Sequence, residues 1–179
     1  MLLNRGSKVV FSGHGPCRLG AVVIKTFAGM KTRFYPLIAM DDSSDVLFVP
    51  VEKIKTLRIR RLMEKSEILT LLSRLGWEAE KAMPPASVKN WKQRAVDNSA
   101  LLGSGSATDL VKLIGSLTEL NETKALAARD RHVLDKARKH LICEISEVLG
   151  ESRSAAEEKL DDALKHAKAR LRSPGISPR

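Results

Sequence analysis

The hydrophobic pattern of this chain of 179 residues changes its period near residue 62, and that change constrains the fold more than any other feature. Before it, short β-branched and aromatic runs alternate with turn signals at residues 12–16 and 41–45. After it, apolar residues recur three to four positions apart, as in amphipathic helices. The sequence therefore predicts an α+β protein, with a small β region first and an all-helical region second.

Five short strands are expected in the first region, at residues 8–11, 17–27, 33–40, 46–49 and 57–60. Short strands joined by tight turns favour a strongly bent antiparallel barrel of the SH3 or Tudor type. Residues 21–24 are typical of a buried strand. Pro36 lies inside the third strand and has no backbone N–H to donate, so that strand is expected to be an edge or to carry a bulge.

Helices are expected from Ser66 onward. Ser66, Ser106 and Ser154 have the side chain and spacing of N-caps, and the longest helix is expected at 128–149. Ala127, just before that helix, has no side chain that can cap it. The predicted domains are a β domain at 1–62, a short helix and linker at 63–85, a helical domain at 86–172 and a disordered tail at 173–179.

The formal net charge of +10 favours a polyanionic partner, and nucleic acid is the usual one. The charge is unevenly spread, however. Residues 86–164 contain 12 basic and 13 acidic residues, so any contact with DNA there must come from local clusters at 89–94 and 129–139. Arg58, Arg60 and Arg61 fit either a nucleic-acid patch or the charges that protect an exposed strand edge.

The sequence contains no arrangement that is typical of catalysis, and no Walker loop, HExxH or GxSxG motif, so an enzyme is not expected. Cys17 and Cys143 have no second ligand at a metal-binding spacing and are expected to be reduced thiols. His140 and Cys143 share a helix face, which indicates packing. We expect no cofactor and no metal, and a monomer. A cytoplasmic protein without membrane contact is expected, because no signal peptide or long apolar run occurs.

Several segments resemble the CarD and CdnL family of bacterial transcription regulators. They are 6–15 (GSKVVFSGHG), 49–53 (VPVEK), 57–60 (LRIR), 90–94 (NWKQR) and 134–145 (LDKARKHLICEI). The likeness covers about residues 5 to 150, in the family's order. It implies a β domain shared with the transcription-repair coupling factor, a helical domain that binds DNA, and association with the nucleoid through RNA polymerase.

The resemblance implies that the β domain binds the β subunit of RNA polymerase, partly by pairing strand edges. Lys25 matches a basic residue that helps to hold that subunit, with Phe27 beside it. Phe48 stands where the family usually has a second basic residue, just before Val49 and Pro50. One charged contact with polymerase is therefore expected to be missing.

The resemblance also implies that Trp91 is wedged into the minor groove at the upstream edge of the transcription bubble and stabilises the open complex. Arg94 and Arg131 match positions that contact phosphate, whereas Gln93 replaces a common Arg. The expected DNA-binding residues are Lys89, Asn90, Trp91, Lys92, Arg94, Arg131 and Arg138.

Three alternatives remain open from the sequence. Trp91 lies on an apolar stripe with Val88 and Ala95, so without the resemblance it is more typical of a core residue. The helical domain could instead bind another protein, which would make the chain a polymerase adaptor, and an RNA- or ribosome-associated Tudor-like protein is a further reading. The direction of regulation, activation or repression, does not follow from the sequence.

Overall fold

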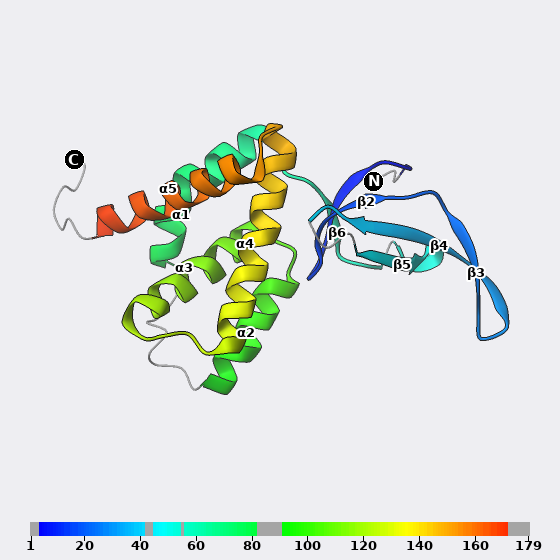
Figure 1. Ribbon diagram of the computed structural model, residues 1–179, viewed down its shortest axis with the longest axis horizontal. Coiled ribbons are helices and arrows are strands. Elements are labelled where there is room, and N and C mark those ends of the chain that lie inside the picture. The colour runs from blue at the N-terminus through cyan, green and yellow to red at the C-terminus, as the bar shows by residue number, and fades with distance from the viewer. Residues whose placement is uncertain (1–3, 42–44, 55, 82–90, 172–179) are drawn as a thin grey trace.

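The computed structural model describes residues 4–41, 45–54, 56–81 and 91–171. Its strands are β1 Lys8–Phe11, β2 Gly15–Leu19, β3 Val23–Phe27, β4 Met30–Ala39, β5 Val46–Pro50 and β6 Ile59–Arg61, with a 3-10 turn at Val51–Lys53. Its helices are α1 Lys65–Lys81, α2 Trp91–Gly103, α3 Ala107–Thr123, α4 Ala128–Leu149 and α5 Arg153–Leu171. The strands gather at one end and the helices at the other (Figure 1), so the α+β prediction is confirmed.

The β domain is one antiparallel sheet in the order β3-β4-β2-β1-β6, with β5 on the other side of β4. The long strand β4 therefore pairs with three neighbours. Val9, Cys17, Leu19, Leu37 and Val49 form its small core. The β3–β4 hairpin projects from this core, away from the helices (Figure 1).

The expected strand at 17–27 is wrong, because the chain is interrupted between β2 and β3. Leu19 pairs with Leu37 and Val23 pairs with Phe34, so three residues on one side oppose two on the other. Gly20 donates its N–H to the carbonyl of Pro36 at 2.7 Å. This bulge turns β3 away from the core, and the expected burial of 21–24 is wrong, since Ile24 is 67% exposed.

Pro36 is not on an edge strand, since β4 is paired on both sides. It lies opposite the interruption between β2 and β3, and because proline has no backbone N–H, no donor of this residue is left unpaired there. A Cβ on Gly20 would come within 2.6 Å of the Pro36 ring, so the close approach of these two backbones requires a glycine. The bulge predicted from Pro36 is present, but it lies in the segment between β2 and β3 that pairs with β4, and not in β4 itself.

The five helices share a second core, to which Ile68 and Leu75 of α1 contribute together with residues of α3, α4 and α5. The expected short helix and linker is instead a helix that runs to Lys81 and packs against α5 and α3. The uninterrupted 128–149 helix is confirmed as α4. The expected disordered tail, and residues 86–90 at the beginning of the expected helical domain, lie outside the described residues.

Helix caps follow the sequence only in part. Ser106 accepts the N–H of Asp109 and caps α3 as expected. In α5 the cap is Ser152, which accepts the N–H of Ala155 at 3.2 Å, so the prediction of Ser154 is wrong by two residues. At α1 the Glu67 carboxylate accepts the N–H of Glu64, where Ser66 was expected to cap. Ala127 precedes α4 without a side-chain cap.

Candidate functional site

An apolar face covers the outside of β4 and β5. Alternate residues of a strand share a face, and the cross-strand pairs Ile38–Val46 and Pro36–Phe48 lie on the outer one. Phe48 is 42% exposed and Val46 44% exposed. Exposed apolar side chains that are contiguous mark an interaction surface more often than scattered ones do.

Lys25 and Phe48, two of the predicted polymerase-binding residues, are brought together on this face. The Lys25 ammonium lies over the Phe48 ring, 3.1 Å from its centroid. Such a cation–π contact at an exposed site contributes about 0.5–1 kcal/mol. The ring of Phe48 in β5 thus helps to orient the side chain of Lys25, which comes from β3.

The strand that carries Phe48, Val49 and Pro50 has one open edge, since among the described strands β5 pairs only with β4. Val49 is only 6% exposed and packs its side chain into the core. It can therefore contribute to an interface through its backbone. Phe27 ends β3 opposite Met30, and its side chain lies outside what the structure describes.

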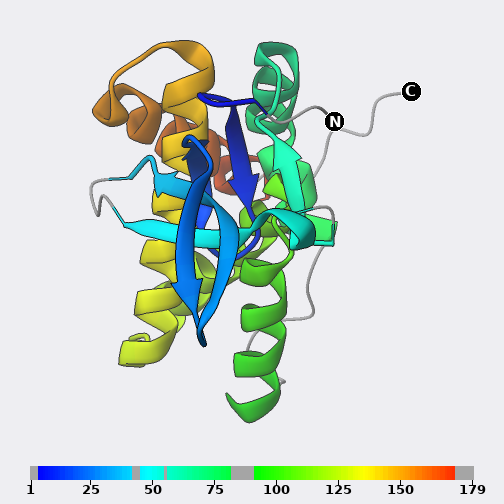
Figure 2. The same cartoon turned by 90° about the vertical axis from the view of Figure 1, so that its right-hand side faces the viewer.

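Trp91 is the first residue of α2 and is 63% exposed, so it is not a core residue. The buried face of α2 consists of Ala95 and Asn98 instead. Figure 1 shows that α2 begins at the end of the helical domain far from the sheet and runs towards the sheet, and in Figure 2, which faces the sheet, α2 (green) begins below the strands. The Lys92 ammonium lies 5.6 Å from the Trp91 ring centroid.

Two of the predicted DNA-binding arginines are engaged within the protein. Arg94 donates to the buried carboxylate of Asp130 at 3.2 Å and joins α2 to α4. Arg138 donates to Glu157 and Asp161 at 3.1 and 2.8 Å and joins α4 to α5. Arg131 is exposed in the first turn of α4. Lys89 and Asn90 lie outside the described residues.

Two family models match the chain. The CarD-like/TRCF RID domain matches residues 3–63, and the CarD C-terminal domain matches residues 79–161. The chain belongs to the CarD-like family. The Bacillus subtilis (strain 168) protein named "Putative transcription factor YdeB" is 27% identical over 149 residues, which cover 81% of this chain and 91% of that protein. The matches place this CarD-like chain among transcription regulators rather than in a known class of enzyme.

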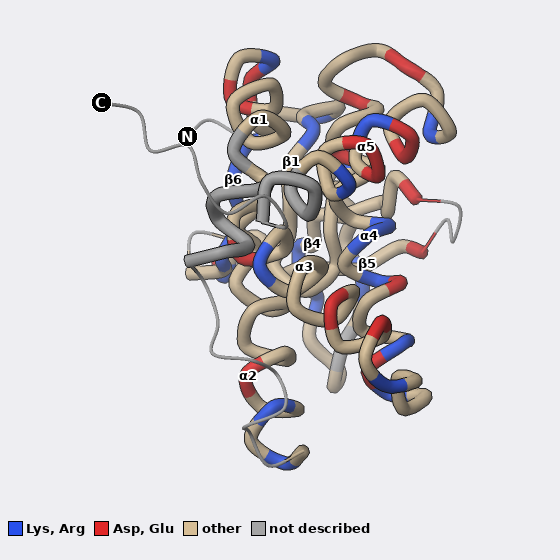
Figure 3. Tube along the Cα trace, turned by 90° about the vertical axis from the view of Figure 1, so that its left-hand side faces the viewer, with Lys and Arg blue, Asp and Glu red and all other residues tan. Residues whose placement is uncertain are grey.

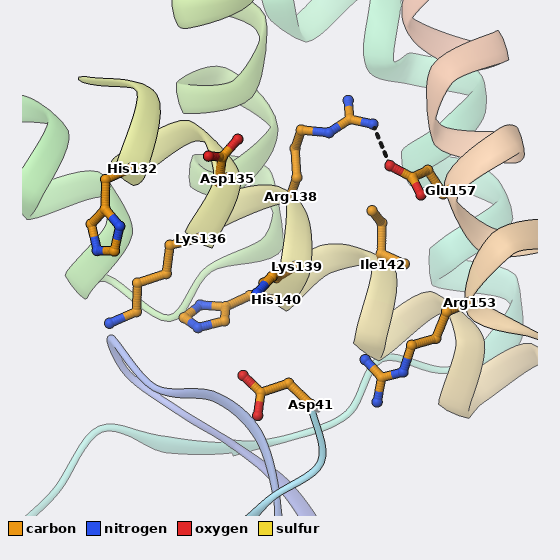
Figure 4. Close-up of a pocket in the computed structure, with 10 residues that line it drawn as sticks. All are labelled: Asp41, His132, Asp135, Lys136, Arg138, Lys139, His140, Ile142, Arg153 and Glu157. Atoms are coloured by element: carbon orange, nitrogen blue, oxygen red, sulfur yellow. Dashed lines mark hydrogen bonds and ion pairs between the residues drawn. The ribbon is translucent and has the colours of Figure 1, made fainter. Parts of the chain in front are cut away.

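A hollow of about 640 Å³ lies where α4 and α5 of this CarD-like protein face the β domain. Figure 4 shows Lys136 and His140 of α4 pointing to the side where Asp41 lies, while Arg138 turns to Glu157. Cations and carboxylates mix around it, so the lining favours no one charge. Among the described residues no three potential ligands gather to hold a metal, and none of the described helices is long and apolar enough to cross a membrane.

The packing of the two CarD-like domains against each other is the feature that the sequence did not predict. Arg60 of β6 donates from both Nη atoms to the two oxygens of Glu144 in α4, at 2.6 and 2.8 Å. Its Nε donates to the carbonyl of Gly105 at 2.6 Å, and the N–H of Met63 donates to Glu144 at 2.9 Å. We call these four residues the interdomain joint. The guanidinium of Arg60 is thus engaged within the protein, and it serves neither of the two roles considered from the sequence, a contact with nucleic acid or the protection of a strand edge.

Other contacts lie along the same face of α4. His140, Glu144 and Glu147 follow one another at helical spacing on this face. A Cβ on Gly15 would come within 2.5 Å of the His140 ring, so only glycine fits there. Lys8 pairs with Glu147 at 2.8 Å. We call this contact surface between α4 and the β domain the seam. The only sign of it in the sequence was the charged Glu144 inside the otherwise apolar run 141–145.

Proposed function

We propose that this CarD-like chain is a transcription regulator that binds the RNA polymerase β subunit with its β domain and promoter DNA with its helical domain. The β5 edge and the outer face of β4 and β5 hold the polymerase. Trp91 enters the minor groove at the upstream edge of the bubble and stabilises the open complex. The protein acts as a monomer, with domains at about 1–62 and 63–172.

The observation that carries this proposal is the exposure of Trp91. A tryptophan that is 63% exposed at a helix start buries little of its apolar surface within the fold. Stacking such an indole on a base contributes about 1–3 kcal/mol, and the bases at a fork are already partly unstacked. Because the indole binds the open state better than the closed one, it shifts the equilibrium towards opening.

The polymerase half is supported by the surface around Phe48. An open strand edge offers backbone hydrogen bonds, and the apolar face with Lys25 beside it offers specificity. The contact also tethers the helical domain near DNA, which raises the effective DNA concentration. Affinity for free fork DNA should therefore be modest and fall with salt.

The DNA contact is tested by the lifetime of open complexes with Trp91→Ala. We expect the lifetime gained from the protein to fall about tenfold, which corresponds to about 1.4 kcal/mol. Val96→Ala is the matched control, since Val96 is also 63% exposed on α2. An unchanged lifetime with Trp91→Ala would reject the wedge.

The polymerase contact is tested with Phe48→Asp in the full chain. We expect a loss of at least about tenfold in affinity for the β subunit, because a charge placed on the apolar face must be desolvated. Ile24→Asp is the control, since Ile24 is 67% exposed on the opposite face of the hairpin. Equal effects of the two variants would show that the outer face is not the docking surface.

A polymerase adaptor whose helical domain binds a protein is the second candidate. The near balance of 12 basic and 13 acidic residues in 86–164 favours it, and so do the internal pairs of Arg94 and Arg138. Figure 3 shows basic and acidic positions interleaved along this part of the chain. Crosslinks from promoter DNA that map only to the β domain would select the adaptor, whereas crosslinks to α2 would select the DNA-binding function.

A further inference from the structure

The C-terminal end of α2 is attached to the β domain. Ser12, in the turn between β1 and β2, donates its hydroxyl to the carbonyl of Gly103, the last residue of α2. Two residues later, Gly105 accepts from Arg60 and lies against Ser12. The turn that follows α2 is therefore held by two side chains of the β domain.

Trp91 lies at the opposite end of the same helix. α2 has 13 residues, and at 1.5 Å per residue its ends are about 18 Å apart. A rotation of about 10° at the held end would move the indole by about 3 Å, which is close to the thickness of a base. The angle at which α2 leaves the β domain thus decides where the indole lies.

Among the contacts between β1, β2 or β6 and α4, that of Arg60 is the most directional. The Lys8–Glu147 ion pair is partly exposed, and exposed ion pairs contribute little to the free energy that keeps two elements in place. The Gly15–His140 contact is a packing contact without direction. Glu144, in contrast, is only 1% exposed, and its two-point pairing with a planar guanidinium fixes distance and orientation together.

We propose that Arg60 is a positioning residue for Trp91. By pairing with Glu144 and with the carbonyl of Gly105, it makes the β domain and α2 one rigid unit, so that docking on polymerase fixes the reach of the indole. This inference rests on the proposed function. It adds that the interdomain joint, far from either binding surface, determines how well the protein stabilises open complexes.

The test uses the full chain with Arg60→Met and Glu144→Leu combined, which leaves no buried charge unpaired and so protects the fold. Arg60→Lys is the second variant, because lysine keeps the charge but loses the two-point geometry. Arg61→Met is the control for loss of an arginine from β6, since Arg61 is the exposed neighbour of Arg60. Circular dichroism checks the fold of each variant.

Two quantities are measured on each variant. The first is the distribution of distances between spin labels at Arg18→Cys and Ser99→Cys, in a Cys17→Ala, Cys143→Ala background. The second is the open-complex lifetime at protein concentrations that saturate polymerase. We expect the double variant to broaden the distance distribution and to shorten the lifetime about threefold to tenfold, with unchanged affinity for the β subunit. Arg60→Lys should fall between, and Arg61→Met should behave as wild type.

The failures are distinguishable. A wild-type lifetime for the folded double variant, with a shortened lifetime for Trp91→Ala, would overturn the positioning role and leave the proposed function intact. A shortened lifetime without a broader distance distribution would also overturn it, since the loss would not come from orientation. A wild-type lifetime for Trp91→Ala would remove the proposed function, and this inference with it.

Discussion

At the scale of single residues, His140 is a titratable group that the packing of the two domains keeps neutral. It is only 5% exposed, with Gly15 of β2 against its ring. Burial lowers the pKa of His140 from 6.5 to about 4, with a smaller contribution in the same direction from Lys136 and an opposing one from Asp41. The folded state therefore binds this proton less readily than the unfolded state does.

This predicts a loss of stability in mild acid. As the pH falls below about 6.5 the unfolded chain takes up the proton first, so the free energy of unfolding decreases until the folded pKa near 4 is reached. Between pH 7 and pH 5 the loss from His140 should be about 2 kcal/mol. Urea unfolding at several pH values measures it.

The comparison for this prediction is between two histidines of α4. His140→Leu should flatten the pH dependence, whereas His132→Leu, at an exposed position of the same helix, should leave it as in the wild type. If both variants keep the wild-type slope between pH 7 and pH 5, the neutral buried histidine is not its source.

Two residues show what a single sequence can and cannot predict at this scale. The apolar stripe of α2 favoured a buried Trp91, and only the family resemblance pointed to the exposed position that the structure has. Glu144 is buried because Arg60, 84 residues away in the chain, supplies its countercharge. No local pattern reveals such a partner, because side-chain pairing between distant residues depends on the packing of whole domains.

At the scale of elements, helix α5 begins at Arg153, three residues after Gly150 ends α4, and its first turn depends on an N-cap. The Ser152 hydroxyl accepts the N–H of Ala155, which would otherwise have no partner in the first turn. Ser154 lies inside the helix. Leu160 and Leu164 of α5 are part of the helical core, so loosening the start of α5 weakens the contact with α1.

We therefore expect Ser152→Ala to reduce the free energy of unfolding by about 1 kcal/mol. Ser154→Ala is the natural control, because it removes another exposed serine hydroxyl two residues later. It should have almost no effect or be slightly stabilising, since alanine favours a helix interior. Thermal or urea unfolding measures both, and a larger loss with Ser154→Ala would reassign the cap.

Elements with a clear period were predictable and those with mixed signals were not. The 22 residues of α4 were predicted to their ends, because the apolar face repeats over six turns. The interruption between β2 and β3 was missed, since the apolar run 21–24 looks like one buried strand. The N–H of Gly20 in this segment donates to the carbonyl of Pro36 on β4, and only the registers of the paired strands reveal the bulge.

At the scale of the whole molecule, the two domains put the candidate surfaces at opposite ends. The apolar face at Phe48 lies on the projecting sheet, and Trp91 lies at the end of α2 that is far from the sheet, as Figure 1 shows for the elements that carry them. The seam between them runs along α4. The order of the domains was predictable from the change of period, but their relative placement was not, because it depends on contacts such as Arg60–Glu144.

We infer that Trp91 favours open over closed promoter DNA. The most direct measurement is the equilibrium between open and closed promoter complexes, followed by the chemical reactivity of unpaired bases, with wild type and with Trp91→Ala. On a duplex promoter we expect the substitution to lower the ratio of open to closed complexes about tenfold. On the same promoter with a mismatched, pre-melted bubble, the bases should stay equally reactive with both proteins, because no closed state competes. An unchanged ratio of open to closed complexes on the duplex promoter would contradict this inference.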